Sequence, residues 1–352
     1  MKKALITGSS GLVGSETVDF FYKKKFKIYA IDNNLRSLLF GKESSTLPLK
    51  KYQEKKYPSI NFLNLDIVNY TKLESVFVEN KFDIIIHTAG QPSHDWSAKD
   101  PILDFKVNAL GTINLLELTR KYCPKAVFIY TSTNKVYGDS PNFIKGLKEL
   151  KTRFEVYKNK KLFSINEKFS IDDSKHSPFG VSKTAGDLYV QEYGKYFGLK
   201  TVSFRCGCIT GPNHKGAELH GFLSYLVSCI IQNKHYKIFG YKGKQVRDNI
   251  HAKDLVQMFW YVYNKPGYGE IYNAGGGRSN SISVLEAISL TNHIANKNWQ
   301  NFSIKKANRK GDHIWYVTDY SKFKKKYPNW KLNYSNEDII SQIISNYYKN
   351  KN

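Results

Sequence analysis

The sequence predicts an α/β protein, in which a doubly wound parallel sheet is joined to a smaller C-terminal α/β domain. Two observations predict this fold. In the first half of the chain, short runs rich in β-branched residues alternate with segments of helical periodicity, and this alternation favours a parallel sheet with helices on both faces. A glycine-rich turn directly follows the first of these runs. The length of 352 residues suits one large α/β unit or a main domain with a smaller companion.

The predicted elements alternate along the chain. Strands are predicted at Lys3–Thr7, Lys27–Ile31, Asn61–Leu65, Asp83–His87, Ala126–Thr131 and Lys200–Phe204. Helices are predicted at Gly11–Lys24, Tyr70–Glu79, Ile102–Tyr122 and Pro178–Phe197. Two long connections, Leu35–Ser59 and Asp139–Ser177, interrupt this rhythm. Because long connections in compact domains are often functional, we expect binding loops or lids there.

The composition limits the possible partners. The formal net charge is +24, but the lysines are scattered along the chain, so we expect no nucleic-acid partner. No run approaches the roughly 18 consecutive apolar residues of a membrane span, and the apolar stretch after the basic start is too short for a signal peptide. The four cysteines lack paired zinc-type spacing. We therefore expect a cytoplasmic protein with reduced thiols, no membrane contact and no metal site.

The glycine-rich turn predicts a Rossmann-type dinucleotide site. Its glycines permit a tight turn, a close backbone approach to a pyrophosphate and close packing of helix on strand. Asp32 ends the second strand, where a carboxylate would bind the ribose hydroxyls of NAD, although the nearby Arg36 leaves NADP possible. The predicted contacts of this part are Gly8, Ser10, Gly11, Leu12, Val13, Gly14, Asp32, Asn33, Asn34 and Arg36.

Five further segments carry a family resemblance. They are Leu65–Ile67, Ala89–Gln91, Asn108–Glu117, Thr131–Gly138 and Arg247–Asp254. In this order they resemble the motifs of the extended short-chain dehydrogenases/reductases, in the branch of NAD-dependent sugar epimerases and dehydratases. The resemblance covers nearly the whole chain. It implies that residues 1–206 form the NAD-binding domain, with 252–264 returning to it, and that residues 207–352 mainly bind a nucleotide sugar. It also implies cofactor contacts by Asp66, Ile67, Ala89, Gly90, Gln91, Asn108, Thr131, Lys183 and Cys206.

Within this family, three stretches look like those of CDP-paratose 2-epimerases. They are Ser132–Gly138, His176–Pro178 and Gly243–Asp248. The resemblance implies a nucleoside-diphosphate sugar as substrate and a tightly bound NAD. A sugar carbon of this kind has no acidic C–H bond, so the implied route is transient oxidation and hydride return. It further implies a homodimer or homotetramer, paired through the helices at Ile102–Tyr122 and Pro178–Phe197.

One departure affects the predicted catalytic centre. The family's usual base is the tyrosine of Y-x-x-x-K, whose lysine lies one helical turn later and lowers the tyrosine pKa. Thr133 and Lys183 match the family's hydroxyl and lysine, but Phe179 occupies the tyrosine position. Three interpretations remain open. Another group is the base, with His176, Lys183, Cys208 and Tyr137 as candidates; the chain is an inactive homologue or an engineered trap; or another tyrosine, such as Tyr157, takes the place.

The substrate side has its own candidates. Sugar 4,6-dehydratases carry Asp-Glu after the threonine, whereas Asn134 and Lys135 stand here, so dehydration is not expected. Arg247 and Arg309 match positions that bind the nucleotide's phosphates, which suits the planar guanidinium. Asp312 is expected to order the Arg309 loop. The predicted substrate contacts are Gln91, Thr133, Asn134, Lys135, Cys208, His214, Glu218, His220, Gln245, Arg247, Arg309 and Asp312.

The sequence therefore favours an NAD-dependent epimerase of a nucleoside-diphosphate hexose, with carbon 2 preferred. Two alternatives remain. One is a UDP-hexose 4-epimerase or a keto-sugar reductase on the same scaffold. The other is a non-catalytic protein that binds a nucleotide sugar or NAD, which Phe179 permits.

Overall fold

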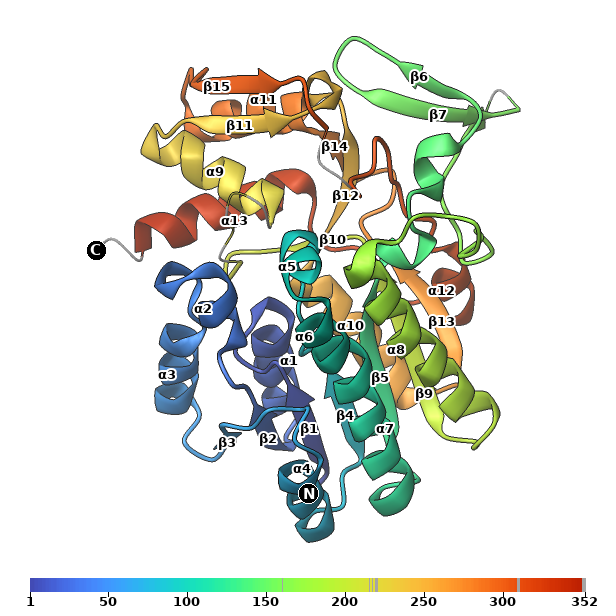
Figure 1. Cartoon of the computed structure of the whole chain (residues 1–352). Coiled ribbons are helices and arrows are strands. Elements are labelled where there is room, and N and C mark those ends of the chain that lie inside the picture. The colour runs from blue at the N-terminus through green and yellow to red at the C-terminus, as the bar shows by residue number, and fades with distance from the viewer. Residues whose placement is uncertain (160, 215, 217, 219–220, 309–310, 350–352) are drawn as a thin grey trace. The chain divides into compact units, whose positions relative to one another are not determined.

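The computed structural model describes residues 1–352 except 160, 215, 217, 219–220, 309–310 and 350–352. The chain divides into two compact units (Figure 1). The first consists of Met1–Val136, Ser177–Arg205 and Leu255–Tyr272, and the second of Tyr137–His176, Cys206–Asp254 and Asn273–Asn352.

This division differs from the expected boundaries. The segment Tyr137–His176, which was expected in the first domain, belongs to the second unit. Side-chain and backbone hydrogen bonds explain the difference: the Tyr137 hydroxyl donates to Asn273 Oδ1 at 2.7 Å, and the backbone N–H of Ile165 donates to the carbonyl of Val317 at 2.8 Å. The returning segment of the first unit is Leu255–Tyr272 rather than 252–264.

A seven-stranded sheet forms the centre of the first unit. Its strand order is β13-β9-β5-β4-β1-β2-β3. The bounds are β1 (Lys3–Thr7), β2 (Lys27–Ile31), β3 (Asn61–Leu63), β4 (Ile84–His87), β5 (Val127–Thr133), β9 (Lys200–Cys206) and β13 (Glu270–Ala274). The pairs β1–β2, β1–β4, β2–β3 and β4–β5 are parallel. The predicted doubly wound α/β fold is confirmed, and parallel pairing brings the carboxyl ends of these strands to one edge of the sheet.

Helices cover both faces of this sheet. On one face α4 (Tyr70–Glu79), α7 (Gly111–Tyr122) and α8 (Ser177–Lys195) pack side by side (Figure 1). On the other, α1 (Leu12–Lys23) contacts α10 (Ala252–Asn264) through the rings of Phe21 and Trp260, whose centroids are 6.0 Å apart.

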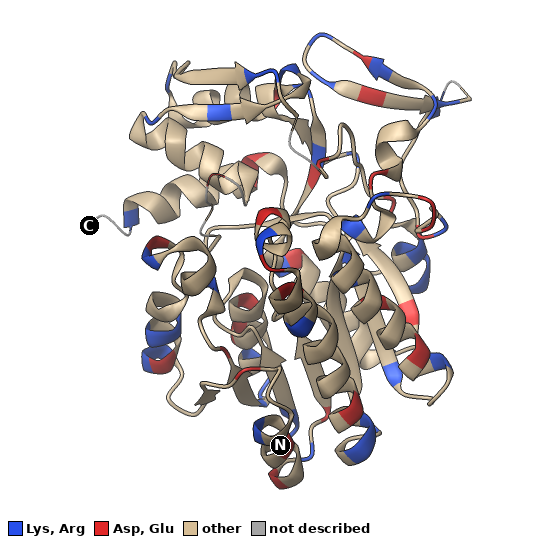
Figure 2. Cartoon of the chain, viewed as in Figure 1, with Lys and Arg blue, Asp and Glu red and all other residues tan. Residues whose placement is uncertain are grey.

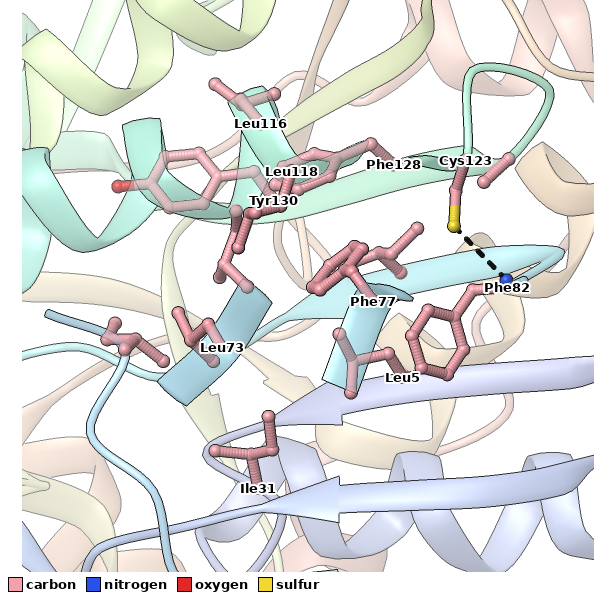
Figure 3. Packing of buried hydrophobic residues seen from close by; sticks show 14 of the residues in the cluster. Leu5, Ile31, Leu73, Phe77, Phe82, Leu116, Leu118, Cys123, Phe128 and Tyr130 are labelled. Atoms are coloured by element: carbon pink, nitrogen blue, oxygen red, sulfur yellow. Dashed lines mark hydrogen bonds between the residues drawn. The ribbon is translucent and has the colours of Figure 1, made fainter. Parts of the chain in front are cut away.

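The hydrophobic core of the first unit lies between the strands and the helices α4 and α7. Figure 3 shows Leu5 and Ile31 from β1 and β2 below Phe77 and Leu116 from these helices. The backbone N–H of Phe82 donates to the Cys123 sulfur at 3.3 Å, so this thiol serves packing. Burial of these side chains, at roughly 25 cal/mol per Å² of apolar surface, fixes the strand ends where the predicted site residues lie.

The two long connections contain regular structure. Leu35–Ser59, expected as a loop, forms α2 (Leu35–Phe40), the 3₁₀ turn η1 (Lys42–Ser44) and α3 (Leu47–Lys56). The second connection forms the 3₁₀ turn η4 (Ser140–Phe143) and the strands β6 (Leu147–Glu149), β7 (Phe154–Lys158) and β8 (Lys161–Leu162), which pair antiparallel. These segments are lysine-rich and short of apolar residues, so their hydrophobic pattern is too weak to reveal the elements.

The predicted helix at 102–122 is interrupted. It consists of α6 (Pro101–Phe105), the π-helical turn η2 (Lys106–Leu110) and α7. A short helix, α5 (His94–Lys99), precedes it, and the 3₁₀ turn η3 (Asn134–Tyr137) follows β5. Single π-turns inside α-helices frequently mark functional sites, and η2 contains the predicted cofactor residue Asn108.

The second unit has a separate core. It contains a three-stranded sheet of β10 (Cys208–Thr210), β12 (Val246–His251) and β14 (Ser281–Ser283), and the parallel pair β11 (Tyr236–Phe239) and β15 (Phe302–Lys305). Three helices, α9 (Phe222–Gln232), α11 (Val284–Ala295) and α13 (Asn336–Lys349), pack on one another through a second hydrophobic cluster. The short elements are η5 (Tyr241–Gly243) and α12 (Ser321–Lys326).

Two further findings concern the distribution of charge and the apolar character of the helices. Figure 2 shows Lys and Arg scattered over the ribbons of both units, with acidic residues among them. Among the helices that the structure describes, none has the length and apolar character needed to cross a membrane.

Candidate active site

The turn between β1 and α1 leaves no room for side chains at Gly8 and Gly14. Gly8 has φ of +66°, and a Cβ atom there would lie 2.7 Å from the backbone nitrogen of Ala89. A Cβ atom on Gly14 would lie 2.0 Å from the carbonyl oxygen of Gly8. The turn is therefore specific for glycine for two physical reasons, a left-handed backbone and a close contact between helix and strand.

Polar groups at this turn point to an anionic ligand. Gly11 caps α1 without a side-chain hydrogen bond, so the backbone N–H groups of the first helical turn can bind phosphate oxygens. The hydroxyl groups of Ser9 and Ser10 are buried and have no hydrogen-bond partner among the described residues. Asp32 Oδ2 accepts a hydrogen bond from the Ser10 backbone N–H at 2.9 Å. These features fit the pyrophosphate of a dinucleotide on the turn.

A cavity of about 230 Å³ lies beside Asp32. It is lined by Asp32, Asn33, Asn34, Thr46, Leu47, Lys50 and Asn64. Asn34, with φ of +56°, accepts hydrogen bonds at its Oδ1 from the Thr46 backbone N–H at 2.9 Å and from the Thr46 hydroxyl at 3.0 Å. This cavity adjoins the carboxylate expected to bind the ribose. Thr46, Leu47 and Lys50 were not among the predicted cofactor contacts, although they belong to the connection in which a binding loop or lid was expected.

Three further predicted cofactor residues follow β2 and β3. The guanidinium of Arg36 lies over the ring of Phe40, 5.0 Å from its centroid, and burial lowers its pKa. The Oδ1 atom of Asp66 accepts a hydrogen bond from the backbone N–H of Val68 at 2.9 Å, which fixes the turn after β3. Ile67 is buried against Gly111, where a Cβ atom would lie 2.6 Å from its Cδ1. Ile67 therefore holds this turn to the first residue of α7.

A buried hydrogen-bond network supports the loop after β4. Asn108 Oδ1 accepts from the backbone N–H of Gln91 at 2.9 Å, and its amide donates to the Gln91 carbonyl at 3.0 Å. The Gln91 amide donates to Asp104 Oδ1 at 2.7 Å and to the Ser93 carbonyl at 2.9 Å. Burial raises the pKa of Asp104. Gln91, expected to touch cofactor and substrate, thus uses its side-chain amide to hold this loop in place.

Lys183 occupies the position expected for the family lysine. Its Nζ donates to the carbonyl oxygen of Thr131 at 2.7 Å and lies 4.2 Å from the centroid of the Tyr130 ring. A Cβ atom on Gly90 would be 3.7 Å from this Nζ. Burial and, to a lesser degree, the Lys183 charge hold the pKa of His87 well below its usual value. The structure thus brings Lys183 together with Gly90 and Thr131 at the carboxyl ends of β4 and β5.

Thr133 ends β5, and Asn134 and Lys135 follow it in η3. The Thr133 hydroxyl lies 3.5 Å from Asn134 Oδ1 and accepts a hydrogen bond from the Lys135 backbone N–H at 3.2 Å. Asn134 is buried. Neither residue provides the carboxyl pair that the dehydratase motif supplies at these positions.

Phe179 lies in the first turn of α8, four residues before Lys183, so both side chains share a helix face. Its ring is 7% exposed. The ring contacts the imidazole of His94 edge to face, with 4.9 Å between centroids and an interplanar angle of 66°. His94 Nδ1 lies 2.9 Å from the Ser177 hydroxyl. Sequence reasoning missed His94; the available signal was a histidine three residues after the Ala89–Gln91 motif.

The other groups considered as bases have different surroundings. The Tyr137 hydroxyl is fully buried and donates to Asn273. His176 Nδ1 lies 3.0 Å from the carbonyl oxygen of Ser174. Tyr157 belongs to β7 of the second unit, with the Lys148 ammonium 5.4 Å from its ring centroid. Cys208 is half-buried in β10, also in the second unit. Burial of the Tyr137 hydroxyl weakens its case as the base.

The second unit carries most of the predicted substrate contacts. Arg247 is buried on β12, and its guanidinium donates to Asp312 Oδ1 at 2.5 Å, to the Val246 carbonyl at 2.7 Å and to the His313 carbonyl. Asp312 therefore orients Arg247. The buried Gln245 Oε1 has no hydrogen-bond partner among the described residues.

Three of the remaining predicted residues, Cys206, His214 and Glu218, belong to the described part of the chain. Glu218 pairs with Lys237 at 3.5 Å, and both side chains are about half exposed. The His214 backbone N–H donates to the Gly211 carbonyl at 3.0 Å. Cys206 is buried at the end of β9. His220 and Arg309 lie outside the described residues.

Comparisons with known proteins agree with this geometry. The model of the NAD dependent epimerase/dehydratase family matches residues 4–275. The chain belongs to this family. NAD is accordingly its cofactor, and the residues of the β1–α1 turn and Asp32 fit it.

Individual relatives show how far the similarity extends. The chain is 31% identical to a CDP-paratose 2-epimerase of Salmonella typhi over 84% of this chain and 85% of the relative. Its structure resembles that of a UDP-glucose 4-epimerase of Thermotoga maritima bound to UDP-glucose, with a TM-score of 0.80, 23% identity and coverage of 99% and 100%. It also resembles a dTDP-glucose 4,6-dehydratase of Bacillus anthracis in complex with NAD, with a TM-score of 0.78, 23% identity and coverage of 100% and 98%.

Proposed function

We propose that the protein is an NAD-dependent epimerase of a nucleoside-diphosphate hexose, acting at carbon 2. The observation that carries the proposal is the arrangement around Lys183, whose ammonium lies beside Gly90 and the Thr131 carbonyl in a unit with a glycine turn for NAD. The similarity to a CDP-paratose 2-epimerase supports the choice of carbon 2.

The reaction requires positioning and proton transfer from the protein. NAD, when bound, would supply the hydride acceptor and donor for epimerisation at the sugar carbon. Lys183 binds the nicotinamide ribose and supplies positive charge next to the reacting hydroxyl. Thr133 donates a hydrogen bond to that sugar oxygen. A base must hold the hydroxyl proton while the ketone exists, and Phe179 lacks an ionisable group for this role.

A dehydratase activity is not proposed. Removal of water from a sugar needs an acid to protonate the leaving hydroxyl and a base to take the neighbouring proton. At the two positions after Thr133 the chain has Asn134 and Lys135, an amide and an ammonium. Neither side chain supplies the carboxyl acid and base of the dehydratase motif. Their absence is consistent with epimerisation, a reaction that removes no oxygen from the sugar.

The second unit has a binding role in this proposal. Arg247, oriented by Asp312, binds the diphosphate, because a planar guanidinium forms two parallel hydrogen bonds with phosphate oxygens. Gln245 and Cys208 contribute to recognition of the nucleotide sugar. A UDP-hexose 4-epimerase is the second candidate, supported by the similarity to the Thermotoga maritima enzyme. A keto-sugar reductase would instead consume NADPH stoichiometrically.

We further propose that two copies pair through α6 and α8. Large apolar side chains are exposed on these helices and the adjoining turns: Ile102, Phe105, Leu110, Val181, Leu188, Tyr189, Tyr196 and Phe197. Exposed apolar side chains gathered on neighbouring helices are typical of a subunit interface, and α6 and α8 pack against each other. Light scattering of Val181→Asp should give a monomer where the unchanged protein gives a dimer or tetramer. A monomeric unchanged protein would contradict this pairing.

The first experiment on function is an NMR assay without added cofactor. Purified protein is incubated separately with CDP-, UDP- and GDP-hexoses, and the anomeric proton signals are followed. A new manno-type signal from a gluco-type substrate is expected for epimerisation at carbon 2, and a galacto-type signal would assign carbon 4. Absence of any conversion, together with unchanged melting temperatures on addition of each nucleotide sugar, would contradict an epimerase.

A further inference from the structure

The proposed reaction lacks its usual base, and the first unit offers one substitute. The imidazole of His94 lies against the Phe179 ring, 4.9 Å between centroids. It therefore occupies the surroundings of the position where the family tyrosine would stand. Imidazole titrates near neutral pH and is the commonest general base in enzymes.

His94 is held in place from two sides. Its Nδ1 lies 2.9 Å from the hydroxyl of Ser177, the first residue of α8. On the other side, Ser93 caps α5, and the buried Gln91 amide donates to the Ser93 carbonyl at 2.9 Å. The histidine is thus fixed both to the helix that carries Phe179 and Lys183 and to the loop after β4. A general base needs such fixed geometry to reach a substrate hydroxyl.

Other titratable groups of the first unit are less suitable. His87 is fully buried, and its two ring nitrogens contact the hydroxyls of Thr7 at 2.8 Å and Thr112 at 3.1 Å. Tyr130 is also fully buried, and desolvation raises its pKa. Asp104 is 1% exposed. His94, by contrast, is half-buried.

We propose that His94 is the general base that replaces the missing tyrosine, an inference that rests on the proposed epimerase function. With the Nδ1–H donating to the Ser177 hydroxyl, the Nε2 atom carries the lone pair. As the sugar is oxidised, the substrate O–H bond breaks and its proton forms an N–H bond at Nε2. When the ketone is reduced on its other face, the same N–H bond breaks and the proton returns to the oxygen. The protein ends each cycle unchanged.

The test compares His94→Asn in two backgrounds. An asparagine can keep the hydrogen bond to Ser177 but has no titratable ring. In the unchanged background we expect kcat to fall by about 10²- to 10⁴-fold, the usual contribution of a general base. In the Phe179→Tyr background the tyrosine restores a conventional base, so the same change should cost about tenfold or less. His293→Gln, an exposed histidine on α11, is the matched control and should leave turnover unchanged.

A second measurement does not depend on turnover. In ¹⁵N-histidine NMR spectra of the NAD-loaded protein, the resonance lost in His94→Asn identifies His94. Saturating nucleotide sugar should shift its Nε2 signal, whereas the His293 signal should stay in place. An unshifted Nε2 signal, or equal loss of kcat from His94→Asn in both backgrounds, would overturn the assignment. If His94→Asn keeps turnover within threefold, the epimerase stands and only the His94 inference fails. If the unchanged protein converts no sugar, both proposals fail.

Discussion

The turn between β1 and α1 and the first turn of α8 belong to the same unit, yet only the first keeps the full pattern of its family. At the cofactor turn, the backbone decides the chemistry: Gly8 and Gly14 leave no space for a Cβ atom, and Asp32 accepts a hydrogen bond from Ser10. At the start of α8, a side chain decides it, and Phe179 removes the usual ionisable group. The contrast predicts that NAD binding and proton transfer depend on different residues and can be lost separately.

The largest effect is expected from a substitution in the β1–α1 turn, which is expected to bind NAD. In Gly14→Ala the new Cβ atom would lie 2.0 Å from the Gly8 carbonyl oxygen, which forces the helix from the strand. We expect loss of about 2 kcal/mol or more in the free energy of unfolding and loss of NAD binding, measured by chemical denaturation and calorimetry. Ser75→Ala, on the exposed face of α4, is the control, because it leaves the β1–α1 turn unchanged. Unchanged NAD affinity in Gly14→Ala would refute the role of this turn.

The second largest effect is expected from a substitution of Lys183 that leaves the β1–α1 turn intact. Lys183→Met removes the ammonium that lies beside Gly90 and the Thr131 carbonyl, so kcat should fall by about 10²- to 10⁴-fold. NAD binding should weaken much less than in Gly14→Ala, because the pyrophosphate turn is intact. Lys72→Met, on the exposed face of α4, is the matched control. If Lys183→Met lost all NAD binding, NAD binding and proton transfer would not be separable.

A smaller effect is expected at the ribose end of the cofactor turn. Asp32→Ala removes a carboxylate expected to accept hydrogen bonds from the ribose. Hydrogen bonds to charged groups contribute about 1.5–3 kcal/mol, so the affinity for NAD should fall about 10- to 100-fold while that for NADP falls less. Calorimetric titration with both cofactors measures this difference, with the exposed Asp172→Ala as control. An equal loss for both would argue against discrimination by this carboxylate.

The smallest effect concerns the pH dependence of stability. Burial raises the pKa of Asp104 in the folded protein. The folded state therefore binds this proton more tightly than the unfolded state does, and stability falls as pH rises from the unfolded pKa through the folded one. Asp104→Asn keeps an acceptor for Gln91 and Asn108 but removes this titration. Its stability relative to the unchanged protein should increase from pH 4.5 to pH 7.5 in urea unfolding curves. If the difference in unfolding free energy between Asp104→Asn and the unchanged protein were constant with pH, the raised pKa of Asp104 would be contradicted.

The sheet was predictable because its signals are local. The strands at Lys3–Thr7 and Lys27–Ile31 agree residue for residue with the observed β1 and β2, since short β-branched runs bounded by turns need no tertiary information. The helix at 102–122 was predicted as continuous, but it contains a π-turn at Asn108. Tertiary hydrogen bonds from Gln91 to this asparagine support that turn, and periodicity does not report them.

The candidate site also has parts that local sequence patterns predict and parts that depend on tertiary contacts. Motif spacing selected Lys183 from the sequence, four residues after Phe179 on one helix face, and the structure shows that its Nζ donates to the Thr131 carbonyl on β5. The segment Tyr137–His176 was expected with the NAD-binding domain but belongs to the second compact unit, because hydrogen bonds such as Tyr137 to Asn273 join residues far apart in the sequence. The cavity residues Thr46 and Lys50 were missed for a related reason, since polar helices carry little hydrophobic periodicity.

The sequence by itself determined the family, the parallel sheet, the NAD turn and the absence of the tyrosine base at Phe179. Each of these depends on residue type at a fixed spacing. Only the tertiary structure decided which group lies against Phe179. His94 comes from another strand-to-helix connection, and its ring meets Phe179 and Ser177 across 85 and 83 positions of sequence. Contacts at such separations are set by the packing of α5 on α8, a property of the folded chain that no local pattern encodes.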